Sequence, residues 1–356
     1  MTSESSGRVQ MAAKQKPTVK LSNNIYQMLR NNMLLVIFFV IVVIGATTSE
    51  YFLTLPNISN LLRSMAVPGI LALGMTFVLL VARIDLSVAA LMIFAPVVGV
   101  SVMAFAGEIF DFKVLVRGNS YAGSASALIV LALITGPIVG FISGVGVVYM
   151  RITSFIVTLA MMQALRGLNY VLTNGHAYYL QVPSFTWIGK LQVLGIPFSF
   201  IIYALITGLA ALVLRYTIVG RRLMAIGGDE KAAILAGINT RFWVIFTFVV
   251  SGFCAGLAGV LFTSRLQSVD APLALGFELT AIAFAVVGGV SLAGGKGSPY
   301  RAFLGALVIS AMLNVFNMWG LNTWYQNIST GLIVILVVMA DRFTSERQAK
   351  VLRNTV

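Results

Sequence analysis

Long apolar segments alternate with short polar ones along most of the chain. Ten of the apolar segments are long enough, or nearly so, to cross the hydrocarbon core of a membrane, which is about 30 Å thick. They lie at 33–53, 61–82, 86–106, 125–150, 154–174, 196–215, 242–264, 275–292, 300–319 and 324–341. In lipid such segments form helices, because a helix satisfies its backbone hydrogen bonds within itself. The pattern predicts an all-α polytopic membrane protein with about ten transmembrane helices.

The polar stretches give the chain an orientation. Residues 1–32 form a basic N-terminal tail and residues 342–356 a second tail, on either side of a transmembrane domain at 33–341. Ten spans place both tails on one side of the membrane. If that side is the cytoplasm, most of the 24 lysines and arginines lie in cytoplasmic tails and loops, as the positive-inside rule expects. We therefore expect both termini to be cytoplasmic. The basic residues outside this pattern are Arg63, Lys113, Arg117, Arg166, Lys190 and Arg265.

The composition supports a membrane protein and excludes several other classes. The chain is 59% hydrophobic with a mean hydropathy of +0.95, far above the range of soluble domains. Its net charge of +13 follows from the basic tails and loops, so we expect membrane lipid and not nucleic acid as a partner. One cysteine, Cys254, and one histidine, His176, exclude a disulfide within the chain and a multi-histidine or cysteine metal site.

The longest charged interruption in the second half of the chain is GRRLMAIGGDEKAAILAGIN at 220–239. Charges of this density do not lie in lipid, so the segment is at the membrane surface or projects from it. We predict that Gly227 and Gly228 break the preceding segment, that Asp229 caps a short new helix with Glu230 in its first turn, and that Gly237 ends it. The small side chains on this helix leave a flat face; they are Ala232, Ala233 and Ala236. The segment is either an ordinary cytosolic loop or a docking surface for another protein.

The chain contains no ATP-binding motif that could power active transport. The stretch GGVSLAGGKG at 288–297 resembles a phosphate-binding loop, but Val290 occupies the first glycine position and Gly297 follows Lys296 where Ser or Thr is required. No carboxylate pair, catalytic triad or metal cluster stands out either. We therefore expect a protein that is not an enzyme and binds no cofactor, so that any ATP is bound by a partner subunit.

Four ionisable residues lie within or beside apolar segments: Arg83, Asp85, Arg166 and Glu278. Charges in a membrane need partners and often mark a transport pathway. Asp85 either caps the third segment or braces neighbouring helices, or it contacts the solute directly. Small residues at a spacing of four also recur, at Gly136, Gly140 and Gly144 in the fourth span and at Gly252 and Gly256 in the seventh. This spacing favours close helix packing in lipid.

Several stretches resemble the permeases of ribose/galactose-type ABC sugar importers. IDLSV at 84–88, SFIVTL at 154–159 with RGL at 166–168, and ELTAIAFAVVGGVSLAGGKG at 278–297 are similar to family motifs in the same order, and 220–239 looks like the family's coupling loop. The resemblance implies the ABC importer permease fold, with a cytoplasmic coupling loop at 216–241 whose short helix docks on the ATPase. The residues implied in coupling are Gly227, Gly228, Asp229, Glu230, Ala232, Ala233, Ala236, Gly237 and Ile238.

The same resemblance implies an assembly in a bacterial inner membrane. Its other members are an ATPase subunit with tandem cassettes, a second permease copy or paralogue, and an extracytoplasmic sugar-binding protein. Candidate pathway or gating residues on the matching stretches are Arg83, Asp85, Ser87, Thr158, Arg166 and Glu278. Two positions depart from the family pattern: Arg83 stands where family members usually carry glycine, and Thr280 stands where they often carry aspartate.

Two functions remain open from the sequence. The first is the permease subunit of an ATP-driven importer for a monosaccharide or related polyol, coupled to its ATPase through 220–239. The alternative is an ion-coupled secondary transporter of a small polar solute, with Asp85 and Glu278 as the carboxylates that such a mechanism needs.

Overall fold

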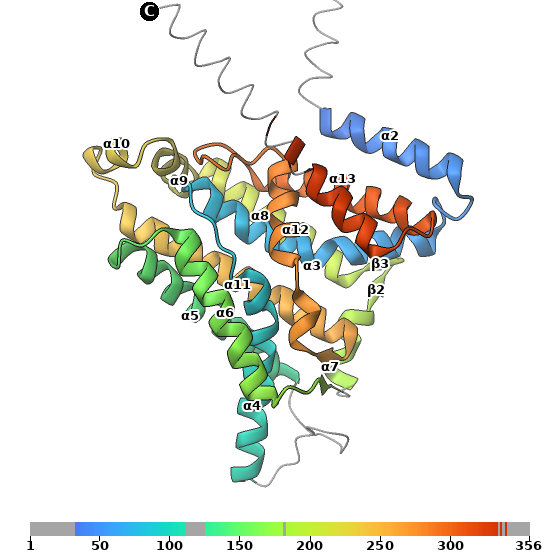
Figure 1. The fold of residues 1–356 in the computed structure, drawn as a ribbon, viewed down its shortest axis with the longest axis horizontal. Coiled ribbons are helices and arrows are strands. Elements are labelled where there is room, and N and C mark those ends of the chain that lie inside the picture. The colour runs from blue at the N-terminus through green and yellow to red at the C-terminus, as the bar shows by residue number, and fades with distance from the viewer. Residues whose placement is uncertain (1–32, 111–124, 181–182, 334, 337–338, 340–356) are drawn as a thin grey trace, which may run out of the picture.

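The computed structural model describes residues 33–110, 125–180, 183–333, 335–336 and 339. The predicted tails at 1–32 and 342–356 lie outside the described residues. Figure 1 shows a bundle of helices. The described residues also form four strands of two residues each. The helices are α2 (Met33–Thr48), α3 (Leu55–Leu80), α4 (Val88–Phe110), α5 (Ala125–Tyr149), α6 (Ser154–Thr173), α7 (Pro183–Lys190), α8 (Phe198–Tyr216), α9 (Ile218–Gly228), α10 (Glu230–Leu235), α11 (Thr240–Leu266), α12 (Phe277–Val287) and α13 (Pro299–Met318), with a 3₁₀ turn η1 (Ala271–Ala274).

The strands form two antiparallel pairs. β1 (Tyr178–Tyr179) pairs with β4 (Ser268–Val269), so that Tyr178 lies opposite Val269. β2 (Gln192–Val193) pairs with β3 (Ile196–Pro197) in a tight hairpin. Each strand has only two residues, so the two sheets contribute little to the fold, which is all-α.

The observed helices agree with the first nine predicted spans. Six described helices are long and apolar enough to cross a membrane: α3, α5, α6, α8, α11 and α13. The apolar helices at Met33–Thr48, Val88–Met103 and Pro272–Val287 are shorter. The tenth predicted span, 324–341, lies only partly within the described residues, so the count of ten remains a prediction.

Helix α3 forms the centre of the bundle. Every residue from Met65 to Leu80 is buried, and α8, α11, α12 and α13 pack around the helix. Its 26 residues span about 39 Å at a rise of 1.5 Å per residue, more than the hydrocarbon core requires. A helical segment that is apolar on nearly all sides, as 65–80 is, is expected in such a central position.

Close packing of α5 on α11 uses the glycines whose spacing indicated it. A Cβ atom added to Gly136 would lie 2.2 Å from the carbonyl oxygen of Gly252, and one added to Gly140 would lie 2.2 Å from that of Phe248. Gly256 approaches the Ala132 carbonyl oxygen in the same way, at 2.6 Å. The prediction that these small residues permit close helix contact is confirmed.

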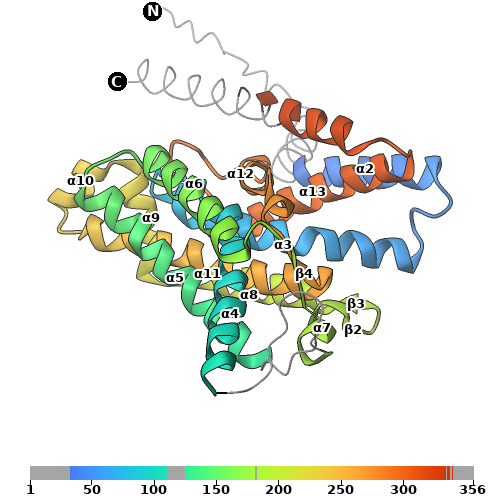
Figure 2. The same ribbon diagram turned by 60° about the horizontal axis from the view of Figure 1, so that its bottom comes forward.

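Several of the short elements gather at two ends of the bundle. In Figures 1 and 2, α9 and α10 lie at one end, and α7 with the β2–β3 hairpin lies towards the other. We call the first the α10 end. The loop between α3 and α4 and the glycine-rich loop after α12 also reach this end, since both contact α9 or α10 through Arg83, Gly294 and Gly295.

Candidate functional site

The α10 end is built from two short helices joined by a single residue. The Asp229 carboxylate accepts hydrogen bonds from the backbone N–H groups of Lys231 at 2.9 Å and Ala232 at 3.0 Å, which satisfies the first turn of α10. The helix ends at Leu235, and Gly237, two residues further on, has a φ of +78° that favours glycine and stops the helix from continuing. The predicted cap, short helix and stop are therefore present.

Helix α9 ends at Gly228, where the sequence predicted a break, but Gly227 lies within its last turn and is helical. A Cβ on Gly227 would lie 1.9 Å from the Leu80 carbonyl oxygen and 2.3 Å from the Gly295 nitrogen. Gly228 has no neighbour within 4 Å of that position. Gly227 is thus required for a close approach of α9 to the end of α3 and does not act as a helix breaker.

The exposed face of α10 differs from the flat alanine face that the sequence suggested. Ala233 is 4% exposed and buried against its own chain. Leu235 is 90% exposed and Ile234 55%. Sequence reasoning passed over these two apolar residues, although an Ile-Leu pair inside a polar stretch was the available signal. Ala232 and Ala236 are also exposed, whereas Ile238 is partly buried. Contact of this segment with an ATPase remains a prediction.

Arg83 joins the α3–α4 loop to α10. Its guanidinium Nη2 donates a hydrogen bond of 2.8 Å to Oε2 of Glu230. The left-handed backbone that glycine would favour is taken by the preceding residue, Ala82, with a φ of +55°. Arg83 was a candidate pathway or gating residue and Glu230 a candidate coupling residue. The ion pair joins them although they are 147 positions apart in the sequence.

Asp85 is the buried anchor of the same loop. Its Oδ1 accepts hydrogen bonds from the backbone N–H of Ser87 at 3.0 Å and from the Ser87 hydroxyl at 2.6 Å. Its Oδ2 accepts a hydrogen bond of 2.8 Å from the Ser251 hydroxyl on α11. Burial raises the pKa of this carboxyl, while the hydrogen bonds from Ser87 and Ser251 oppose the shift. With Asp85 and Ser87 each 1% exposed, a solute reaches them only if the loop moves.

Helix α6 holds the other side of this loop. The Ile84 N–H donates to the Ser154 hydroxyl at 3.1 Å, and the Thr158 hydroxyl donates to the Ile84 carbonyl oxygen at 3.3 Å and to that of Ser154 at 2.8 Å. Thr158 is fully buried. The loop is therefore held by side-chain contacts with α6, α10 and α11 at once.

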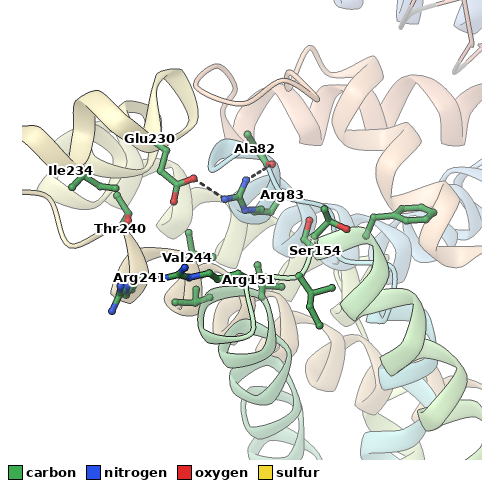
Figure 3. A pocket seen from close by; sticks show the side chains of 14 residues that line it. Ala82, Arg83, Arg151, Ser154, Glu230, Ile234, Thr240, Arg241 and Val244 are labelled. Atoms are coloured by element: carbon green, nitrogen blue, oxygen red, sulfur yellow. Dashed lines mark hydrogen bonds and ion pairs between the residues drawn. The ribbon is translucent and has the colours of Figure 1, made fainter.

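A cavity of 540 Å³ opens beside this loop at the α10 end (Figure 3). Its charged lining residues are Arg83, Arg151, Arg241 and Glu230. In the view of Figure 3 the Arg83–Glu230 pair lies above Arg151 and Arg241. Neither Arg151 nor Arg241 was singled out from the sequence, where each reads as an ordinary loop cation.

The two remaining candidates, Arg166 and Glu278, form a separate pair. Arg166 Nη2 on α6 lies 3.2 Å from Oε1 of Glu278 on α12. The Glu278 side chain is 12% exposed, and its second oxygen has no hydrogen-bond partner among the described residues. Arg166 follows Ser154 by twelve positions, or about 18 Å of helix, so this pair lies well away from the α3–α4 loop.

Comparison with known proteins gives a consistent set of relatives. Residues 57–338 match the family described as "Branched-chain amino acid transport system / permease component". The chain is 36% identical over 301 residues to the ribose import permease protein RbsC of Haemophilus influenzae, covering 83% of this chain and 88% of that protein. No solved structure gives a significant match.

Two further relatives are named for other sugars. The L-arabinose ABC transporter permease protein AraH of Azospirillum brasilense is 34% identical over 294 residues, covering 82% of this chain and 81% of the relative. The D-allose transport system permease protein AlsC of Escherichia coli K12 is 33% identical over 303 residues, covering 85% and 88%.

Proposed function

This chain belongs to the family of ABC transport system permease components, and on that premise we propose that it is the permease subunit of an ATP-driven importer for a monosaccharide or related polyol. As a member of this family with six long apolar helices, it is a multi-pass protein of the inner membrane. The family description refers to branched-chain amino acids, whereas the relatives above are named for ribose, arabinose and allose. Because these relatives match more than four fifths of the chain, they support a sugar as the solute.

The observation that carries the coupling part of the proposal is the exposed apolar face of α10. Leu235 and Ile234 project from a six-residue helix outside the bundle, where a protein partner buries them favourably. The ATPase subunit, with its tandem cassettes, is the partner we propose at this face. It binds and hydrolyses the ATP, and the α10 end faces the cytoplasm.

Two contacts would carry movement of α10 into the bundle. One is the Arg83–Glu230 ion pair, which connects α10 to the loop between α3 and α4. The other is the close approach of Gly227 to the Leu80 carbonyl oxygen at the end of α3. Since α3 is the central helix, displacement of its end reaches most of the bundle. A second permease copy or paralogue and an extracytoplasmic sugar-binding protein at the opposite end complete the proposed assembly.

Copurification with the ATPase tests this proposal. The tagged chain is purified from native membranes in mild detergent, and copurifying proteins are identified by mass spectrometry. We expect an ATP-binding cassette protein with the wild type and its loss with Leu235→Asp, at an unchanged unfolding temperature. Leu194→Asp is the matched control, because Leu194 is 98% exposed but lies at the β2–β3 hairpin near the opposite end, and it retains the ATPase.

Uptake measurements separate the proposal from ion-coupled transport. Import of labelled ribose, arabinose or allose by the assembled transporter should stop when ATP is depleted. Import that continues without ATP and collapses with the ion gradient would overturn the proposal. Ala233→Trp is a poor probe of docking, since a bulky side chain at a buried position disrupts α10 itself.

A further inference from the structure

The cavity at the α10 end has an excess of positive charge. Three arginines and one carboxylate line it, and Glu230 is already paired with Arg83. Arg151 and Arg241 have no carboxylate partner among the described residues. The Arg241 guanidinium lies over the Tyr149 ring at 6.0 Å, which places it beside an aromatic side chain and leaves its charge uncompensated.

The start of α6 adds a second attraction for an anion. Thr153 precedes this 20-residue helix without a side-chain hydrogen bond to its first turn, and Thr153, Ser154 and Phe155 all line the cavity. The free N–H groups of a helix start favour negative charge. Arg151 also holds a φ of +55°, where glycine is favoured, so an arginine stands here at a backbone cost.

An apolar groove continues from this cavity. A second cavity of 600 Å³ shares Ile234, Thr240 and Arg241 with the first and extends along Tyr149, Ile238, Phe242 and Ile245. Tyr149 is 63% exposed and Phe242 57%. They stand at the end of α5 and the start of α11, where aromatic side chains mark the boundary between hydrocarbon and headgroups.

We propose that the two cavities together bind one anionic phospholipid of the cytoplasmic leaflet. The phosphate lies between Arg151, Arg241 and the start of α6, and an acyl chain follows the groove along Tyr149, Phe242 and Ile245. A cationic pocket continuous with an apolar groove fits a phospholipid better than a soluble anion, which has no use for the groove. Since Ile234 and Glu230 of α10 border the site, the bound lipid also steadies α10. The inference rests on the proposed function only for the assignment of this end to the cytoplasm.

Lipid binding to the purified full chain tests the proposal without a transport assay. The chain is stripped of lipid in detergent and titrated with phosphatidylglycerol or with phosphatidylcholine of the same acyl chains, and bound lipid is counted by native mass spectrometry. We expect selective retention of one phosphatidylglycerol. Arg151→Gln and Arg241→Gln should each weaken it about fivefold, as expected for one arginine near an anionic headgroup. Arg221→Gln is the control, because Arg221 is exposed on α9 and lines neither cavity.

Several results would overturn the proposal. The first is equal binding of the two lipids, and the second is that Arg221→Gln weakens phosphatidylglycerol binding as much as the cavity variants do. The third is displacement of phosphatidylglycerol by inorganic phosphate as effectively as by added lipid, which would indicate a free-anion site. Loss of the ATPase with unchanged lipid binding in both glutamine variants would assign the arginines to the protein partner. Arg151→Lys guards against misfolding, since it should keep binding while thermal unfolding reports the fold of every variant. A chain that imports no sugar but retains selective binding would refute the proposed function alone.

Discussion

The Arg83 guanidinium and the Glu230 carboxylate form a 2.8 Å ion pair that ties the loop after the central helix to the helix that projects from the bundle. Their side chains are 30% and 39% exposed. Pairs this accessible contribute only about 0–1 kcal/mol to stability, because water screens them. The contact therefore contributes little to stability, and its main effect is to hold α10 close to the α3–α4 loop.

Removal of this pair should uncouple the transporter without unfolding it. We expect Glu230→Gln and Arg83→Gln to lower sugar import per ATP hydrolysed by several-fold in the assembled transporter, with an unfolding temperature close to that of the wild type. Arg83→Gly should also raise basal ATPase activity. The exchanged pair, Arg83→Glu with Glu230→Arg, should recover part of the coupling. Wild-type import per ATP in both single variants would show that the pair carries no movement.

Gly227 and Gly228 provide a matched test of how α9 is held. Gly227→Ala places a methyl group against the Leu80 carbonyl oxygen, so it should cost about 1–3 kcal/mol and lower the unfolding temperature in detergent. Gly228→Ala has open space around the new methyl group, and it should leave stability unchanged or raise it slightly, since alanine favours helix. Equal behaviour of the two variants would mean that α9 can move away from α3 at little cost.

The hydrogen bonds of Asp85 should be visible in stability. Ser251→Ala removes one donor to a buried carboxylate, a loss of about 1.5–3 kcal/mol. Asp85→Ala should cost at least as much, because it leaves the hydroxyls of Ser87 and Ser251 without their acceptor. Ser64→Ala is the control: its exposed hydroxyl bonds within the same helix turn, and its loss should stay within about 0.5 kcal/mol. Thermal unfolding in detergent measures all three.

The fold was largely predictable because apolar length alone specifies a membrane helix. A helix lies at each of the first nine predicted segments, six of them long enough to cross a membrane, and the cap at Asp229 followed from local chemistry. The face of α10 was not predictable, since six residues are too few for a helical period to indicate which side is buried. Ala233 was therefore assigned to the surface although it is buried, and Leu235 was overlooked.

Several individual residues of the candidate site could be predicted from the sequence, but which of them lie together in space could not. Arg83 and Glu230 were both singled out, yet nothing local relates two positions that far apart. The sequence predicts a helix break at Gly227, whereas its role depends on which backbone lies opposite, here that of Leu80 and Gly295. Arg151 and Arg241 acquire significance only when the ends of α5 and α11 bring them to one cavity.

The ion pair of Arg166 and Glu278 separates a structural role from a role in the pathway. Arg166→Met alone should lower stability by up to about 3 kcal/mol, because it leaves the largely buried Glu278 carboxylate unpaired. Arg166→Met with Glu278→Leu removes both charges and should restore the unfolding temperature. We expect import by this double variant to stay low, since the unpartnered Glu278 oxygen is then no longer available to a hydroxyl of the solute. Recovery of import together with stability would assign the pair to bracing between α6 and α12 and remove both residues from the pathway.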